Sequence, residues 1–282
     1  MDFSEDRVET IYAIDGEPLM LHVWEPPSPQ GVLLGIHGGL AHAGDYVTPA
    51  LFFKDKGYAT IAPDLRGHKQ TKVDIKNFDL YVKDMLDVLD WINGKYPDLP
   101  IFIVGHSMGG LIATVMGLKY PTRLKGVRGF ILSSPYYRNV VPVPKIMEAL
   151  SGVFATILPK MKVPAEDFID VLTHDEEITK RHHEDERKGL RGKYVTARWA
   201  HRILSTQKWV EKQIHEWKFP LYVVVAGKDK LADTSFTEQL LQRIKPDLVK
   251  LRIEPENYHE NFNEINRQEI FDDILEWLNQ QK

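Results

Sequence analysis

The apolar residues of this chain recur with two periods, one typical of strands and one typical of helices. Residues 8–14 and 19–24 flank the turn Asp15-Gly16-Glu17-Pro18, a pattern that predicts a β-hairpin. Residues 32–36 form an unbroken apolar run, which is typical of a strand covered on both faces. Further strands are predicted at residues 58–62, 101–104, 129–132, 221–226 and 249–253, and helices at residues 51–56, 78–92, 111–120 and 265–278.

Strands and helices follow each other in turn up to residue 134 and again from residue 219. This alternation predicts an α/β protein whose mostly parallel sheet carries helices on both faces. Residues 135–218 show helical and charged stretches but no convincing buried strand. We therefore expect a core of residues 1–134 and 219–282, with residues 135–218 inserted as a helical cap (lid) over the active-site end of the sheet.

Charge and cysteine content exclude several classes of function. The 36 Lys and Arg against 40 Asp and Glu give a formal net charge of −4, which leaves no basic surplus for binding nucleic acid. The absence of cysteine excludes disulfides, thiolate metal sites and a cysteine nucleophile. The N-terminal residues are acidic and polar, and no apolar run approaches the roughly 20 residues that span a bilayer. We expect a cytoplasmic protein.

The run Gly105-His106-Ser107-Met108-Gly109 fits the pattern G-x-S-x-G. It directly follows the predicted strand 101–104 and opens the predicted helix 111–120, which is the setting of a nucleophile elbow. Such a turn holds the serine in a strained conformation with its hydroxyl exposed, so its neighbours at either side have to be small. We therefore predict that Ser107 is a nucleophile rather than a serine that merely caps a helix.

A serine nucleophile needs a base and an acid that orients the base. His259 follows the last predicted strand and is the histidine in the required position. Two acids compete for the third role, because both Asp229 and Asp233 follow the strand 221–226. We favour Asp229, which stands three residues past the strand, and expect Asp233 to cap the following helix.

Two other histidines stand close to these residues. We expect His37, at the end of the strand 32–36, to pack under the loop that follows. His106 is next to the serine, and we expect it to point away across the turn as a buried, hydrogen-bonded residue.

Ester chemistry also needs donors for the oxyanion that develops on the carbonyl. One donor is the backbone N–H of Met108, which follows the nucleophile at a helix N-terminus. The second should come from the loop after the strand 32–36, where Gly39 is a better candidate than Leu40. We call residues 37–42 the oxyanion loop.

The segment His182-His183-Glu184-Asp185 invites a metal hypothesis, but it lacks H-E-x-x-H or similar ligand spacing. Acidic and basic residues recur four apart in this region, so we expect a solvated helix face and no metal. Neither G-x-x-x-x-G-K-[ST] nor G-x-G-x-x-G occurs, so a phosphate-binding loop is a poorer interpretation of the glycines. No cofactor is expected.

Taken together, these motifs resemble the α/β-hydrolase superfamily and, more narrowly, its monoacylglycerol lipase and lysophospholipase branch. The resemblance extends from about residue 19 to residue 278, and the order Ser107, Asp229, His259 is the order that the superfamily uses. It implies the α/β-hydrolase fold, with Gly39 and Met108 as oxyanion donors. One departure is Ala41 in the oxyanion loop, where monoacylglycerol lipases commonly carry an acid.

The resemblance implies a serine ester hydrolase that cleaves monoacylglycerol-type lipids to fatty acid and glycerol through an acyl-enzyme. Lysophospholipase and general carboxylesterase are the nearest alternatives, and the sequence does not separate them. Dehalogenases and epoxide hydrolases of this fold need Asp where Ser107 stands. A non-catalytic binding protein usually lacks a member of the triad, and all three are present here.

The most apolar part of the predicted cap is residues 141–164. Seven residues in it share one face of a helix by their spacing, namely Ile146, Met147, Leu150, Val153, Phe154, Ile157 and Leu158. This face either packs on the protein or serves the substrate. In the second case we expect Leu150, Phe154 and Ile157 to line the entrance for an acyl chain, or to contact a membrane or lipid aggregate transiently. The sequence does not indicate the oligomeric state.

Overall fold

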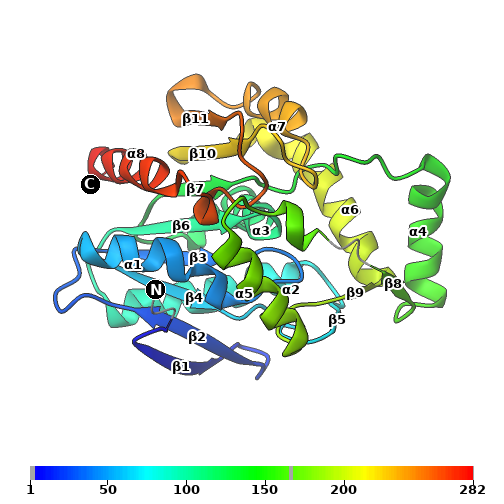
Figure 1. Cartoon of the computed structure of the whole chain (residues 1–282), viewed down its shortest axis with the longest axis horizontal. Helices are drawn as coiled ribbons and strands as arrows, with labels where there is room; N and C mark the ends of the chain where they lie inside the picture. Colours follow the sequence, from blue (N-terminus) through cyan, green and yellow to red (C-terminus); the bar gives the residue numbers. More distant parts are fainter. Residues whose placement is uncertain (1–3, 165–167, 282) are drawn as a thin grey trace.

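In the computed structural model, which describes residues 4–164 and 168–281, an eight-stranded sheet has the order β1-β2-β4-β3-β6-β7-β10-β11 (Figure 1). β2 pairs antiparallel with β1 and β4, and the pairs from β4 to β11 are parallel. The strands are β1 (Arg7–Tyr12), β2 (Pro18–Trp24), β3 (Gly31–Ile36), β4 (Tyr58–Pro63), β6 (Ile101–His106), β7 (Val127–Ser133), β10 (Leu221–Ala226) and β11 (Val249–Glu254).

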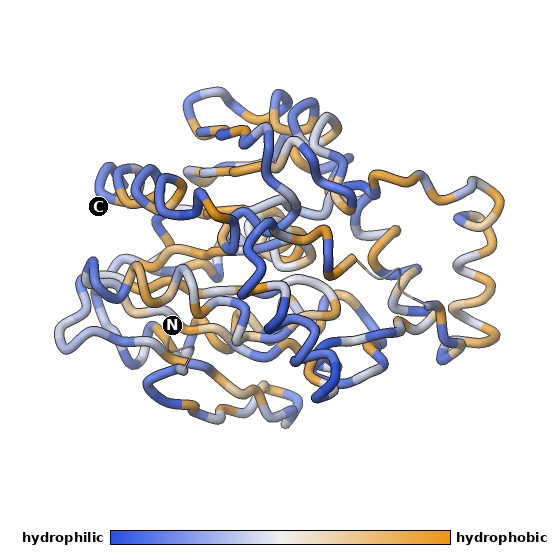
Figure 2. The backbone as a smooth tube through the Cα atoms, viewed as in Figure 1, coloured by the Kyte–Doolittle hydropathy of each residue, from blue (hydrophilic) through white to orange (hydrophobic). Residues whose placement is uncertain are grey.

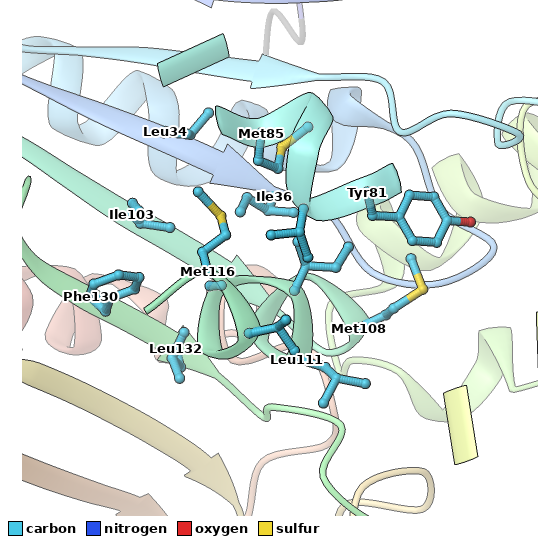
Figure 3. Packing of buried hydrophobic residues seen from close by; sticks show 14 of the residues in the cluster. Leu34, Ile36, Tyr81, Met85, Ile103, Met108, Leu111, Met116, Phe130 and Leu132 are labelled. Atoms are coloured by element: carbon cyan, nitrogen blue, oxygen red, sulfur yellow. The ribbon is translucent and has the colours of Figure 1, made fainter. Parts of the chain in front are cut away.

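Helices cover both faces of the sheet, which confirms the predicted α/β architecture. The helices that pack against it are α1 (Val47–Asp55) and α8 (Arg267–Gln280) on one face, and α2 (Asp79–Lys95), α3 (Met108–Lys119) and α7 (Thr234–Leu241) on the other. Successive residues of a strand point to opposite faces of the sheet. Leu33 therefore packs in the core under α1 and α8, and Leu34 packs in the core under α2, α3 and α7. In Figure 3, Leu34, Ile103 and Leu132 lie around α3.

Two helices begin earlier than the sequence pattern predicts. α3 begins at Met108, directly after Ser107, although apolar periodicity becomes visible only at residue 111. Gly109 and Gly110 occupy the first turn and carry no side chain that could mark a helical face. α1 begins at Val47, four residues before the predicted start.

The segment between β7 and β10 carries α4 (Lys145–Ile157), α5 (Glu176–Arg187) and α6 (Ala197–Gln213). The segment also holds two short strands that the sequence pattern did not indicate, one exposed to half-buried and one mostly buried. β8 (Lys162–Pro164) and β9 (Tyr194–Thr196) form a second sheet with β5 (Lys72–Val73), in the order β5-β9-β8. Strands of two or three residues are too short to show a period in the sequence.

The three cap helices differ in how they meet the rest of the protein. α6 contributes Trp199, Ile203 and Val210 to the core that covers α3. α4 packs against α6 and stands at the outer edge of the molecule in Figure 1. Apolar residues recur along α4 in Figure 2 although the helix is peripheral. Within the described residues, no helix combines the length and the apolar character that crossing a membrane requires.

Candidate active site

Ser107 occupies the turn between β6 and α3 with φ 53° and ψ −118°, a backbone conformation that residues other than glycine rarely adopt. Its N–H donates to the carbonyl oxygen of Ser133 over 2.9 Å, which ties the turn to β7. Glycine is needed on both sides. A Cβ on Gly109 would lie 1.8 Å from the carbonyl oxygen of Ile36, and one on Gly105 would lie 2.6 Å from the carbonyl oxygen of Gly109. The turn therefore has the form of a nucleophile elbow.

His259 and Asp229 form a buried pair beyond the ends of β11 and β10. Nδ1 of His259 lies 2.7 Å from Oδ2 of Asp229, and each side chain is 2% exposed. The other carboxylate oxygen of Asp229 accepts hydrogen bonds from the N–H groups of Leu231 and Ala232, at 2.8 and 2.9 Å. These contacts fix the orientation of the carboxylate, which in turn fixes the imidazole.

The second acid, Asp233, has a structural place instead. Its Oδ1 accepts a hydrogen bond of 2.9 Å from the N–H of Phe236 and so caps α7, as the sequence predicted. Its Oδ2 receives the guanidinium of Arg138 at 2.7 Å. The geometry therefore separates the two acids, because Asp229 is the one that bonds the imidazole of His259.

Electrostatics favour the charged form of the pair. Burial disfavours an imidazolium, but the Asp229 carboxylate and, to a smaller extent, Glu260 outweigh it, so the pKa of His259 lies above 6.5. Burial likewise opposes the Asp229 carboxylate, but His259 and the two backbone N–H groups hold its pKa below 3.8. Nε2 of His259 is buried and has no hydrogen-bond partner among the described residues. This nitrogen is free to accept a proton.

His106 lies against His259 and lines the cavity, so the expectation that it points away is wrong, whereas the expected hydrogen bond is present. Its ring centroid lies 4.8 Å from that of His259, and its Nδ1 lies 3.3 Å from Oγ of Ser133. Burial lowers the pKa of His106 to about 4, and the neighbouring His259 acts in the same direction. His106 is therefore neutral at physiological pH and packs against the His259 imidazole with the two rings tilted at 59°.

The oxyanion loop passes beside the elbow. A Cβ built on Gly39 would lie 3.9 Å from Cβ of Met108, so the two predicted oxyanion donors are neighbours. Leu40 follows with φ 62°. His37 lies beneath the loop as predicted: its Nε2 accepts a hydrogen bond from Leu65 N, so its Nδ1 donates to the carbonyl oxygen of Gly38, at 3.0 and 2.8 Å.

Ser107 and His259 open into one cavity of about 400 Å³. Its other lining residues come from the oxyanion loop, the elbow, the loop after β10, the loop of His259 and the cap: Gly38, Gly39, Leu40, Ala41, His106, Pro164, Phe168, Ile169, Leu172, Glu186, Arg191, Gly192, Lys193, Tyr194, Leu231 and Glu260. The cavity thus has both apolar and charged walls, and it is large enough for part of a small ester.

The segment 182–185 is not a fully solvated helix face, which corrects the sequence interpretation. His182 is completely buried and Asp185 is 6% exposed. His182 Nε2 lies 2.8 Å from a carboxylate oxygen of Glu260, which is 78 residues away in the sequence. The spacing of the buried residues Ile178, His182 and Asp185 was the available signal, since positions i, i+4 and i+7 share one face of a helix.

Three residues, one on α5 and two that follow the oxyanion glycines, lie as close together as metal ligands do. The ligand atoms of His42, Asp45 and Asp185 lie within 4.8 Å of one another. However, Arg191 contacts Asp45 at 2.7 Å and Arg181 lies 3.7 Å from Asp185. These two guanidinium groups supply the positive charge that a cation would bring, so we assign no metal to this cluster.

The α4 residues that the sequence singled out lie away from the cavity. Leu150, Phe154 and Ile157 are not among the described residues that line the cavity. They face solvent, with 42%, 42% and 70% of their surface exposed. The opposite side of α4 packs on α6. The structure therefore does not place these three side chains at the entrance of this cavity.

Comparison with known sequences places the chain among serine hydrolases. Residues 27–266 match the Hydrolase_4 family model, which is described as "Serine aminopeptidase, S33". A monoacylglycerol lipase of Mycolicibacterium smegmatis is 28% identical over 280 residues, which cover 98% of each chain. Phospholipase YtpA of Bacillus subtilis is 31% identical over 253 residues, covering 88% of this chain and 95% of that protein.

Solved structures show the same fold. The monoacylglycerol lipase of Paleococcus ferrophilus superimposes with a TM-score of 0.79 at 21% identity, covering 93% of this chain and 99% of that one. A soluble variant of the Saccharomyces cerevisiae monoglyceride lipase, in complex with a substrate analogue, gives a TM-score of 0.83 at 18% identity, covering 99% and 96%. The α/β-hydrolase fold predicted from the sequence is therefore confirmed.

The family match covers most of the chain, and the relatives match it nearly from end to end. The chain therefore belongs to the Hydrolase_4 family of α/β-hydrolases and is a serine ester hydrolase of the monoacylglycerol lipase and lysophospholipase kind.

Proposed function

We propose that this enzyme hydrolyses monoacylglycerol-type esters to fatty acid and glycerol, with Ser107 as nucleophile, His259 as base and Asp229 as the acid that orients it. The observation that carries the proposal is the different environment of the two ring nitrogens of His259. One ring nitrogen is held by Asp229 at 2.7 Å, while the other has no partner among the described residues, and His259 lines the cavity that Ser107 also lines. A base oriented on one side and open on the other suits proton transfer from a serine.

In the first half of the reaction, Nε2 of His259 accepts the Ser107 hydroxyl proton while Oγ attacks the ester carbonyl carbon. The carbonyl oxygen becomes an oxyanion, which the N–H groups of Gly39 and Met108 would bind. When the C–O bond to glycerol breaks, the imidazolium gives its proton to the leaving alkoxide. Ser107 is then esterified with the fatty acid.

The second half repeats these steps with water. His259 accepts a proton from a water molecule, whose oxygen attacks the acyl carbon and forms a second oxyanion. As this intermediate collapses, the proton returns to Oγ of Ser107 and the fatty acid leaves. Asp229 stays ionised throughout, consistent with its lowered pKa, and stabilises the imidazolium. The steps use side chains, backbone N–H groups and water, and no cofactor enters them.

The substrate class is supported by the relatives. Relatives from a mycobacterium and from mammals are named monoacylglycerol or monoglyceride lipases, and they match 94% or more of this chain. A lysophospholipid is the second candidate, because the 31% identical relative from Bacillus subtilis is named a phospholipase. Both substrates carry one acyl chain on a polar alcohol.

The outer face of α4 fits contact with the lipid aggregate that delivers such a substrate. Ile146, Met147 and Ile157 are 70%, 61% and 70% exposed, and the preceding Val141 is 65% exposed. A contiguous apolar surface of this kind usually contacts another apolar phase. We therefore propose that α4 touches the membrane or aggregate transiently, instead of lining the cavity.

A panel of esters tests the substrate proposal. It combines acyl chains of increasing length with glycerol, glycerophosphocholine and p-nitrophenol as leaving groups. We expect the highest kcat/KM for long-chain monoacylglycerols, and Ser107→Ala should lower turnover on every ester by several orders of magnitude while the protein stays folded. A fluorophosphonate should label the wild type and not this variant. Preference for the glycerophosphocholine esters would instead establish the lysophospholipase, and labelling of Ser107→Ala would refute the nucleophile.

Replacement of the two acids should have different consequences. In Asp229→Asn the imidazole loses the charge that orients and stabilises it, so we expect kcat to fall by about 10⁴ with little change in KM. In Asp233→Ala the helix loses its capping oxygen, and we expect about 1 kcal/mol less stability in urea unfolding with kcat nearly unchanged. Steady-state kinetics on p-nitrophenyl butyrate and unfolding of both variants provide the comparison. Inverted effects would show that Asp233 is the catalytic acid.

The rate should depend on pH through His259, because only the neutral imidazole can accept the Ser107 proton. The imidazole is neutral above its pKa, so kcat/KM should rise with pH on a single ionisation. Since Asp229 favours the charged form, the midpoint should lie above 6.5 and should move down in Asp229→Asn. The profile is measured from pH 5 to 9 on an ester whose chemical step limits the rate. A midpoint below 6.5 would contradict the assignment.

Substitution on α4 should weaken the use of aggregated substrate. Ile157→Ala removes apolar area that is 70% exposed, and Ile265→Ala, at 71% exposed, is a matched control elsewhere on the surface. We expect Ile157→Ala to bind phosphatidylcholine vesicles containing monoacylglycerol roughly tenfold more weakly, since each buried CH₂ contributes about 0.8 kcal/mol. Hydrolysis of p-nitrophenyl butyrate in buffer should be unchanged in both variants. Equal vesicle binding by both variants would refute the contact.

A further inference from the structure

A group of buried charged residues joins the cap to two loops of the active site. Arg191 lies in the cap between α5 and β9, with 7% of its side chain exposed. Its Nη1 lies 2.7 Å from Oδ2 of Asp45 and 3.0 Å from Nδ1 of His182. Its Nη2 lies 3.6 Å from Oε1 of Glu260. One guanidinium therefore contacts three segments that are far apart in the sequence.

The hydrogen bonds fix the tautomer of His182. A guanidinium can only donate, so Nδ1 of His182 accepts from Arg191 and the ring proton is on Nε2. Nε2 then donates to Oε2 of Glu260 over 2.8 Å, and the same oxygen accepts from the side-chain amide of Asn263, also at 2.8 Å. Arg191 thus holds Glu260 directly through its charge and indirectly through an imidazole that it orients.

The two carboxylates depend on this arrangement to remain ionised. Burial would raise the pKa of Asp45, but the positive charge of Arg191 holds it far below its usual range. Burial opposes ionisation of Glu260 as well, and His182 and Arg191 outweigh that effect. Without the guanidinium, two buried carboxylates would lose positive charge that compensates them.

Each carboxylate adjoins a part of the catalytic machinery. Asp45 follows the oxyanion loop, and the N–H of Gly192, next to Arg191, donates 2.9 Å to the carbonyl oxygen of Leu40. That bond holds Leu40 in its left-handed conformation beside Gly39. Glu260 directly follows His259, and its own N–H donates to the carbonyl oxygen of Leu172 in the cap at 2.8 Å.

We propose that Arg191 is a positioning residue for ester hydrolysis: its guanidinium, between Asp45 and Glu260, holds the oxyanion loop and the loop of His259 in fixed relation to each other. The proposal rests on the proposed function of Ser107 and His259, because it assigns Arg191 a role through them. Arg191 sets the distance between the oxyanion donors and the base, and this distance must be correct in the transition state. A displacement of about 1 Å between such groups can lower a rate by about 100-fold.

The test compares Arg191→Gln with Arg187→Gln, a control on α5 whose side chain is 74% exposed and which does not line the cavity. The substrate is p-nitrophenyl butyrate, which carries no glycerol or phosphate that Arg191 could bind. We expect kcat of Arg191→Gln to fall between 10- and 100-fold with KM within threefold of the wild type. Arg187→Gln should keep both values. A rise in KM at unchanged kcat would show that Arg191 binds substrate, and would overturn the proposal.

Chemical rescue separates positioning from folding. In Arg191→Ala, millimolar guanidinium should raise kcat several-fold by filling the vacated place between the carboxylates, and methylammonium at the same concentration should do so less, because it lacks the planar donor geometry. Arg191→Lys should retain more activity than Arg191→Gln. If the folded variants have unchanged kcat, or if neither guanidinium nor lysine restores any of the loss, Arg191 is not a positioning residue.

If the Arg191 variants fail to fold, the variant Glu260→Gln provides the test of the proposal. The groups facing His259 are Asp229, His106 and Glu260, of which Glu260 acts to raise the pKa of His259. Glu260→Gln should therefore lower both kcat and the midpoint of the pH profile, and an unchanged profile with unchanged kcat would overturn the proposal. Failure of the proposed function is distinguished independently, because it would appear as activity or fluorophosphonate labelling that survives in Ser107→Ala.

Discussion

The positive φ of Ser107 is the constraint on which the active site depends. A non-glycine residue in such a conformation is strained by about 1–3 kcal/mol, so the surrounding structure has to hold it. Here β6 lies between β3 and β7, and the N–H of Ser107 is bonded to β7. Gly105 and Gly109 leave the space in which strand, turn and helix approach one another. Because α3 starts directly after the turn, the Met108 amide lies in the first helical turn, where N–H groups lack intrahelical acceptors.

Much of this arrangement follows from the sequence because parallel sheets have a strong signature. Strands buried on both faces appear as continuous apolar runs, and their carboxyl ends meet at one edge. The residues after three of those runs, Ser107, Asp229 and His259, could therefore be expected to converge. The choice of Asp229 over Asp233 also followed from local position, because a residue directly before a helix is a natural cap.

The parts that the sequence did not predict depend on contacts between distant residues. The helix that carries His182 has a charged composition, and charge patterns predict exposure. The His182 side chain is nevertheless buried against Glu260 and Arg191, whose proximity follows from the tertiary fold. β8 and β9 were missed for a related reason, because three residues form a strand only beside a partner, and here β9 lies between β5 and β8. Local patterns report how a segment is buried, and they do not report which segment buries it.

Two parts of the cap reverse the usual distribution of polar and apolar residues: the segment of His182 and Arg191 carries buried charges, and α4 presents apolar residues outward. The buried charges make the cap poorly suited to exchange between related enzymes. A foreign cap without Arg191 and His182 would leave Asp45 and Glu260 buried with less compensation, and loss of one partner from a buried ion pair costs about 3–5 kcal/mol. In recombination or evolution, the part of the cap that carries His182 and Arg191 therefore has to change together with the two core loops beneath it. The α4 helix of the same cap can vary on its own.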